Sequence, residues 1–223
     1  MLEKISGIDL VNKLRAILLM EEDFNMHNKL VFGREMLNNV RDNNLIPSEN
    51  YAEKQSTSED GSWDKILQAD VSRQSRMSTG IISADAGNFY DRIHHTIIAL
   101  VFLSLGVQTG SIIAMLLSIQ LMKFYLWTGW GESQRSIGGD RFRILHGLCQ
   151  GNGAAPAGWA VISITIIGAH KRKGHGGYFM CPITKVAETL AAIIFVDDTD
   201  LLHIRMDKDE SAAEAHAAVQ ESI

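Results

Sequence analysis

Carboxylates that directly follow apolar segments are the residues of this chain best suited to chemistry. The apolar run 190–196 leads into Asp197 and Asp198, and a second run from residue 81 leads into Asp85. Both runs predict buried β-strands, the first with a polar hairpin turn at its end. If the strands are neighbours in one sheet, their negative charges lie together, which is costly unless a divalent cation neutralises them. An ordinary polar turn is the alternative, because Asp and Thr are favoured at turns.

The surrounding sequence predicts the elements that would position these acids. Apolar periodicity predicts helices over 24–40, 63–75, 91–105, 111–126, 154–170 and 208–222, and strands over 14–20, 81–86, 141–145 and on both sides of the paired acids. Residues 47–62 and 128–139 are expected to be irregular. Trp63, Ile66, Leu67 and Val71 are spaced to share one helix face. This order of elements predicts an α+β fold with helices packed on one face of a small sheet.

Length and composition are those of an ordinary globular protein. The chain has 223 residues, 46% of them hydrophobic and only three of them proline, so a sizeable core can be buried. Cys149 and Cys181 lack metal-ligand spacing and predict thiols in a reducing compartment. No signal peptide is recognisable, which predicts an intracellular protein of the cytoplasm or nucleus. The net charge of −5 does not by itself suggest a polynucleotide partner.

One uncharged segment is long enough to span a bilayer. Residues 96–122 contain no Asp, Glu, Lys or Arg. Glycines at 106 and 110 interrupt the segment, and Ser and Gln occur throughout. These features favour two buried helices joined at the interruption, and we expect no membrane span.

Three motifs, in order, resemble the catalytic core of reverse transcriptases. The segment 85–91 (DAGNFYD) is similar to the family's first acidic motif, 147–156 (GLCQGNGAAP) to its Gln-Gly loop, and 195–198 (FVDD) to its aromatic-x-Asp-Asp box. Upstream, 14–19 (LRAILL) and 23–29 (DFNMHNK) resemble the fingers of the retrotransposon and group II intron type. The resemblance covers nearly the whole chain, from about residue 10.

The resemblance implies a fold and a reaction. It implies partial fingers over 1–80 and, over 81–223, a polymerase palm, which is a ferredoxin-like antiparallel sheet with helices on one face. The implied activity is RNA-directed DNA polymerisation, in which a DNA primer 3′-hydroxyl is extended with deoxynucleotides on an RNA template. Asp85 and Asp197 would bridge two Mg²⁺ or Mn²⁺ ions that clamp the attacking and leaving oxygens, with Asp198 beside them.

Substrate contacts are also implied by the resemblance. Tyr90 would act as a steric gate against the 2′-hydroxyl, and Gln150 and Gly151 would let backbone approach the templating base and primer. Arg15 would contact the incoming triphosphate. From the residues alone, a core position for Tyr90 and an ordinary surface position for Arg15 are open alternatives.

Several departures from the family pattern leave other functions open. Ala155 stands where the family often has Ser, and the chain ends at Ile223, before the family's later lysine motif, primer grip and thumb. A truncated, inactive remnant that at most binds nucleic acid is therefore the main alternative. RNA-dependent RNA polymerases usually carry Gly at the position of Val196, and a two-carboxylate metal hydrolase would not need the Gln-Gly loop.

Overall fold

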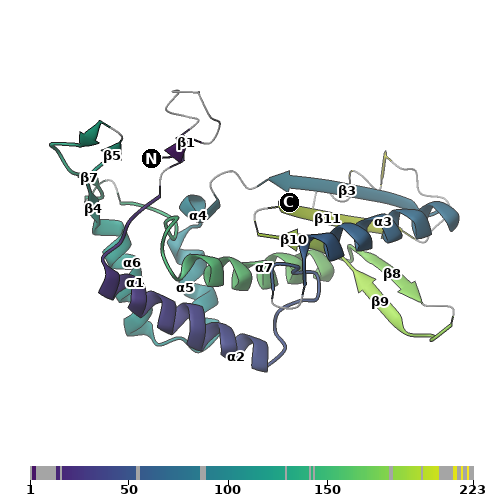
Figure 1. Cartoon of the computed structure of the whole chain (residues 1–223). Helices are drawn as coiled ribbons and strands as arrows, with labels where there is room; N and C mark the ends of the chain where they lie inside the picture. The colour runs from purple at the N-terminus through teal and green to yellow at the C-terminus, as the bar shows by residue number, and fades with distance from the viewer. Residues whose placement is uncertain are drawn as a thin grey trace. The chain divides into compact units, whose positions relative to one another are not determined.

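The computed structural model divides into two compact units, each built from two segments of the chain (Figure 1). Unit 1 consists of Met1–Asn43 and Asn88–Trp159, and unit 2 of Asn44–Gly87 and Ala160–Ile223. The structure describes residues 2–3, 14–15, 17–53, 56–85, 89–128, 130–140, 142, 144–180, 183–196, 198–205, 213–214, 217 and 220. Helices and small antiparallel sheets occur together, so the predicted α+β class is confirmed. Both units contain residues from either side of position 80.

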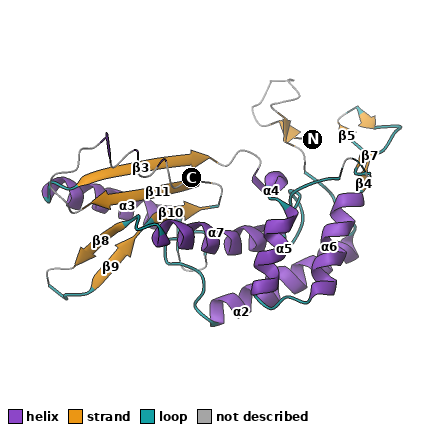
Figure 2. Ribbon diagram, turned by 180° about the vertical axis from the view of Figure 1, so that it is seen from behind, coloured by secondary structure: helices purple, strands orange, loops and turns teal. Residues whose placement is uncertain are grey.

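The centre of unit 2 is a three-stranded antiparallel sheet (Figure 2). Its strands, in spatial order, are β10 (Ala192–Phe195), β11 (Asp198–Arg205) and β3 (Ser78–Asp85). An additional segment extends the sheet beside β10, where Asn50 forms a parallel bridge with Ile194. The Tyr51 N–H donates to the Ile194 carbonyl oxygen at 2.8 Å, and the Ile194 N–H donates to the Glu49 carbonyl oxygen at 2.9 Å. Strand β10 is therefore hydrogen-bonded on both sides, as is the middle strand β11.

A helix lies against each face of this sheet. On one face, Ile167 of α7 (Ala155–Arg172) packs in a core with Ile194 and Leu201. On the other face, α3 (Ser58–Gln74) approaches so closely that a Cβ on Gly61 would come within 3.1 Å of Ile193. Side chains alternate between faces along a strand, so neighbouring apolar residues serve different helices. The expectation that helices cover only one face is corrected.

Helix α3 begins at Ser58, earlier than the predicted residue 63, because a capping box starts it. The Thr57 hydroxyl accepts from the Asp60 N–H at 3.2 Å, and the Asp60 carboxylate accepts from the Thr57 N–H at 2.7 Å. These two bonds satisfy backbone donors that the first turn of a helix leaves unpaired. The end of the predicted irregular segment 47–62 is thus helical.

The face of α3 that packs against the sheet is not the one expected. Trp63, Ile66 and Leu67 are exposed, whereas the buried residues are Gly61, Gln68 and Ser72. Small side chains allow a helix backbone to approach a sheet closely, and Gly61 does so beneath Tyr51 and Ile193. Apolar spacing indicated a shared helix face, and in the structure Trp63, Ile66 and Leu67 on that face are exposed.

Unit 1 is mainly helical. Its helices are α1 (Glu22–Asn28), the π-helical η2 (Lys29–Met36), α2 (Leu37–Asp42), α4 (Phe89–Arg92), α5 (His95–Ser104) and α6 (Thr109–Leu121), with the first part of α7. The first three are contiguous, as predicted for 24–40. Phe32 stacks on Phe102 with ring centroids 5.0 Å apart, and both rings are fully buried. Within the described residues, none of the helices has the length and apolar character needed to cross a membrane.

Short antiparallel ribbons complete the fold. They are β1 (Leu2–Glu3) with β2 (Leu14–Arg15), β4 (Lys123–Phe124) with β7 (Ile137–Gly138), β5 (Trp127–Thr128) with β6 (Gly131–Glu132), and β8 (Gly177–Met180) with β9 (Ala187–Leu190). The predicted helix to residue 126 therefore ends at Leu121, and part of the segment 128–139 is regular. Described residues within 141–145 form no strand. Most of the predicted helix 208–222 lies outside the described residues.

Candidate active site

The register of the unit 2 sheet brings two predicted acidic positions together. Asp198 and Asp85 are partners across the antiparallel strands β11 and β3, which places their Cα atoms about 4.5–5.5 Å apart. The expectation that the two acid-bearing strands are neighbours is confirmed. The Asp198 side chain is exposed, the structure describes Asp85 through its backbone, and Asp197 lies outside the described residues.

The turn before Asp198 has an unusual backbone conformation. Phe195 pairs with Asp198, so a two-residue turn joins β10 to β11. Val196, at the first turn position, has a φ of +53°. Two-residue hairpins favour positive φ there, but Gly or Asn normally supplies it, and a β-branched residue in this region costs about 1–3 kcal/mol. The sheet must offset this strain to hold the acidic turn in place.

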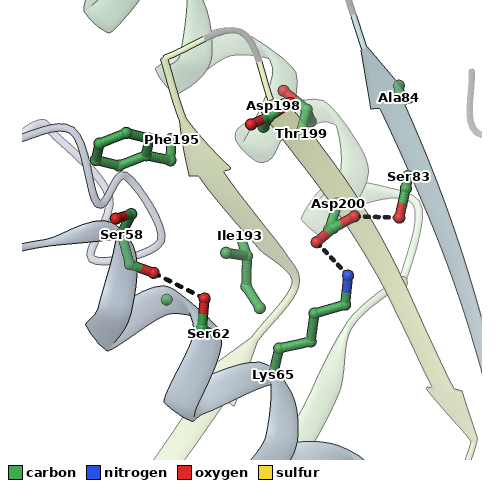
Figure 3. A pocket seen from close by; sticks show the side chains of 11 residues that line it. Ser58, Ser62, Lys65, Ser83, Ala84, Ile193, Phe195, Asp198, Thr199 and Asp200 are labelled. Carbon is green, nitrogen blue, oxygen red and sulfur yellow. Dashed lines mark hydrogen bonds and ion pairs between the residues drawn. The ribbon is translucent and has the colours of Figure 1, made fainter.

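A third carboxylate on the same face of the sheet is neutralised. Asp200 lies two residues after Asp198, so both project to one side of β11. Lys65 of α3 places its Nζ 2.7 Å from Asp200 Oδ2, and the Ser83 hydroxyl donates to Asp200 Oδ1 (Figure 3). Among the described residues, no cation is paired with Asp198. The two acids therefore differ: Asp200 fastens α3 to the sheet, and Asp198 retains an exposed negative charge.

A hollow of about 420 Å³ separates part of α3 from the sheet beside these acids. Figure 3 shows Phe195 and Asp198 near the hairpin turn, with Asp200 farther along β11 and Lys65 reaching toward it from α3. The polar lining of the hollow also includes three serine side chains from α3 and β3: Ser58, Ser62 and Ser83. The hollow thus offers hydroxyl, carboxylate and ammonium groups to a polar ligand.

In unit 1, the predicted Gln-Gly loop has a tightly constrained backbone. Gly147, Cys149 and Gly151 all have positive φ, at +80°, +62° and +112°. A Cβ on Gly147 would run into the Tyr90 carbonyl oxygen, and one on Gly151 would run into the Leu18 carbonyl oxygen. Glycine is required at both positions because it has no Cβ and adopts positive φ without strain.

Backbone hydrogen bonds join this loop to two other predicted site segments. The Leu148 N–H donates to the Tyr90 carbonyl oxygen at 2.6 Å, and the Leu18 N–H donates to the Gln150 carbonyl oxygen at 2.9 Å. The structure therefore brings Tyr90, Gln150 and Gly151 together within unit 1. Arg15 is described through its backbone, in strand β2 of the same unit.

Two acidic groups at the Gln-Gly loop, Asp91 and Cys149, have raised pKa values. Partial withdrawal from water raises the pKa of Asp91, and a hydrogen bond from the Gln150 N–H opposes that rise. Burial, with the nearby charge of Asp91, raises the pKa of Cys149 to about 12. Because the thiolate is the reactive form of cysteine, Cys149 is an inert core residue and not a nucleophile.

Neutral His95 holds the start of the loop. Its Nε2–H donates to the Gly147 carbonyl oxygen at 2.7 Å, and its Nδ1 accepts from the Gln120 amide at 2.8 Å. Burial lowers the pKa of His95, the Gly147 hydrogen bond opposes this, and His146 and His94 lower it further. Protonation of Nδ1 would remove the acceptor that Gln120 uses.

The lowered pKa of His95 predicts that acid weakens unit 1. The unfolded chain binds the proton more readily, so the stabilisation is complete above the unfolded pKa of ~6.5 and is lost as the pH falls from there through the lower pKa of folded His95. We expect a lower free energy of unfolding by urea at about pH 5.5 than at about pH 7.5, and a smaller difference in His95→Gln. His27→Gln, at an exposed position, should keep the wild-type pH dependence. Equal pH dependence in all three chains would contradict this assignment.

The predicted site residues thus form two groups. Asp85 and Asp198 belong to unit 2, and Arg15, Tyr90, Gln150 and Gly151 belong to unit 1. Among the described residues, no set of three or more His, Cys, Asp or Glu is arranged to hold a metal ion, and the metal assignment, which depends on Asp197, stays a prediction. Three contributors were missed: Lys65, Asp200 and His95. Only Asp200 had a signal in the sequence, the two-residue spacing from Asp198.

The fold and the site together describe an α+β protein in which two aspartate positions pair at the ends of adjacent antiparallel strands. No protein-family model matches the chain. No curated protein is significantly similar to it in sequence.

Proposed function

We propose that this chain is the catalytic core of an RNA-directed DNA polymerase that extends a primer 3′-hydroxyl with deoxynucleotides. The observation that carries the proposal is the pairing of position 85 with Asp198 at the ends of adjacent antiparallel strands. The same sequence motifs led us to expect this neighbourhood, although the two positions are far apart along the chain. In this proposal, residues 81–223 act as a palm and residues 1–80 as partial fingers.

The donor set fits hard divalent cations. Position 85, Asp197 and Asp198 offer only carboxylate oxygens, and the exposed side chain of Asp198 has no cation paired with it among the described residues. When held by these three residues, two Mg²⁺ or Mn²⁺ ions would supply the positive charge that activates a 3′-hydroxyl and neutralises a pyrophosphate leaving group. Lys65 keeps Asp200 out of this set by pairing with it.

Unit 1 supplies the proposed contacts to the substrates. Tyr90 is partly buried, and its carbonyl is fixed by the Gln-Gly loop, so a bulky ring in a constrained segment can exclude a 2′-hydroxyl. In this proposal, Gln150 and the exposed Gly151 offer backbone to a base or a primer on the side of the loop that Leu18 does not occupy. Arg15 provides a planar set of donors for the phosphates of the incoming nucleotide.

Primer extension tests the proposal directly. The purified chain is mixed with an RNA template, an annealed DNA primer and Mg²⁺ or Mn²⁺, and we expect addition of the deoxynucleotide complementary to the next template base. Omission of the divalent cation should stop the reaction. Nucleic-acid binding without nucleotide addition under either metal would identify an inactive remnant and reject the proposal.

A further inference from the structure

The ribbon formed by β4, β5, β6 and β7 in unit 1 exposes large aromatic rings. Along residues 123–128, exposed and half-buried side chains alternate, with Lys123, Tyr125 and Trp127 at the exposed positions. Tyr125 is 54% exposed and Trp127 69% exposed, and Trp130, at the tip of the ribbon, is 100% exposed. This is the reverse of the usual preference, since aromatic side chains normally supply the buried face of a strand.

The ribbon is a firmly built platform for these rings. A Cβ on Gly138 or on Gly139 would collide with the end of α6, at the carbonyl oxygens of Met122 and Gln120 respectively, so the base of the ribbon lies directly on that helix. At the tip, the Thr128 hydroxyl accepts from the Trp130 N–H at 3.2 Å. The backbone that carries the exposed rings is therefore held by the end of α6 and by the Thr128–Trp130 hydrogen bond.

Positive charge accompanies the aromatic rings. Lys123 shares their face, and Arg135 is exposed on the returning part of the ribbon. Two more arginines follow at 141 and 143, outside the described residues, so residues 121–146 carry four cations against two acids in a chain of net charge −5. Within 123–127 the exposed positions carry no aliphatic side chain, whereas Ile137 on the returning part of the ribbon is 51% exposed.

We propose that this exposed face, defined by Lys123, Tyr125, Trp127 and Trp130 and named the aromatic ribbon face, binds single-stranded nucleic acid. Proteins bind single strands by combining basic groups along the backbone with aromatic rings on which bases stack. The positive charge that accompanies the rings, in a chain of net charge −5, favours a polyanionic strand over a protein partner, and association with a second copy of the chain is an outcome of the test. This binding site is separate from the acidic site of the proposed polymerase. Only the identification of the bound strand as a template rests on the proposed function.

The separation of Tyr125 and Trp127 along the chain favours a single strand over a duplex. Tyr125 lies between β4 and β5, two residues before Trp127 at the start of β5, so their Cα atoms are at most about 7 Å apart. That limit is roughly twice the ~3.4 Å between successive bases along one strand of a duplex. Bases that have separated from one another can each meet a ring, whereas bases inside a duplex present only their edges. Stacking does not depend on the sugar, so both RNA and DNA single strands fit.

Fluorescence anisotropy with labelled oligothymidylate and oligouridylate, in EDTA and without nucleotides, tests the inference. We expect both strands to bind, a duplex of equal length to bind more weakly, and Trp127→Ala to raise the Kd about 5- to 150-fold. Trp127→Phe should restore most of the affinity because it keeps a stacking ring. The matched control is Trp63→Ala, which removes a ring of equal exposure, 67% against 69%, from unit 2; its Kd should equal that of the wild type.

The outcomes separate this inference from the proposed function. An unchanged Kd in Trp127→Ala, or no binding of either strand by the wild type, overturns the inference even if the chain extends a primer. Self-association that depends on Trp127, with strand binding unaffected, also overturns it and assigns the face to a second copy. Strand binding that depends on Trp127, in a chain that adds no nucleotide, upholds the inference and rejects the polymerase.

Discussion

Replacing Asp198 with Asn is expected to slow nucleotide addition strongly and to make the folded chain more stable. Both results follow from the same geometry, since positions 85 and 198 are direct partners in adjacent strands. Like charges placed opposite one another in a sheet destabilise it by about 0.2–1 kcal/mol. Removing one of them relieves that repulsion and removes a proposed ligand for the divalent cation.

The expected loss of activity is large. A bound divalent cation contributes several kcal/mol of charge stabilisation to a reaction of this type, and each 1.36 kcal/mol is a factor of ten in rate. We therefore expect Asp198→Asn to add nucleotides at least ~100-fold more slowly. In EDTA its unfolding midpoint in urea should be higher than that of the wild type. Added Mg²⁺ should stabilise the wild type more than the variant, because it binds the folded state.

Asp200→Asn is the matched control, because Asp200 lies on the same strand face but is paired. Its carboxylate already has Lys65 and Ser83 as partners, so the substitution removes favourable contacts and should cost about 1 kcal/mol of stability. Nucleotide addition should change little. A stabilised Asp200→Asn, or a fully active Asp198→Asn, would contradict the separate roles assigned to the two acids.

The two acid-bearing strands could be predicted from the sequence because each has a local signature, but their pairing, between segments far apart along the chain, was expected only from the resemblance of the motifs. Each apolar run ends at an Asp, and the polar residues between two such runs specify a hairpin. Once β11 pairs with β3, the period of two fixes which residues share a face. The closeness of the two acid-bearing strands was therefore expected, whereas the register that pairs position 85 with Asp198 and the positive φ of Val196 were not.

Other features depended on contacts that no local pattern encodes. Trp63, Ile66 and Leu67 share a face of α3, but the small residue Gly61 decides which face meets the sheet. His95 holds Gly147 across a separation of 52 residues. The segment 123–138 contains glycines and exposed aromatic residues. Its apolar residues show neither the period of a helix nor the regular alternation of a half-buried strand, so the pattern did not predict its short strands. Tertiary packing, not propensity, settled these elements.

Lys171→Met is expected to give the largest loss of stability among the substitutions considered, because it isolates a buried carboxylate. The Glu49 side chain is 1% exposed, and its Oε1 lies 2.5 Å from Lys171 Nζ. Apart from this ion pair, Oε1 has no hydrogen-bond partner among the described residues. Removing one partner of a buried pair costs about 3–5 kcal/mol. We expect about 3 kcal/mol, at the lower end of that range, because Lys171 is itself 38% exposed.

A double substitution distinguishes the loss of charge pairing from the loss of packing. Glu49→Gln in the Lys171→Met background removes the isolated charge, and most of the lost stability should return in urea unfolding, since a buried amide costs far less than a buried carboxylate. Glu49 also accepts a backbone hydrogen bond from Ile194, so the pair fixes α7 to the segment that extends the sheet at β10. If the double variant is as unstable as Lys171→Met, then packing of the Lys171 side chain, and not the ion pair, holds this edge of the sheet beneath the acidic turn.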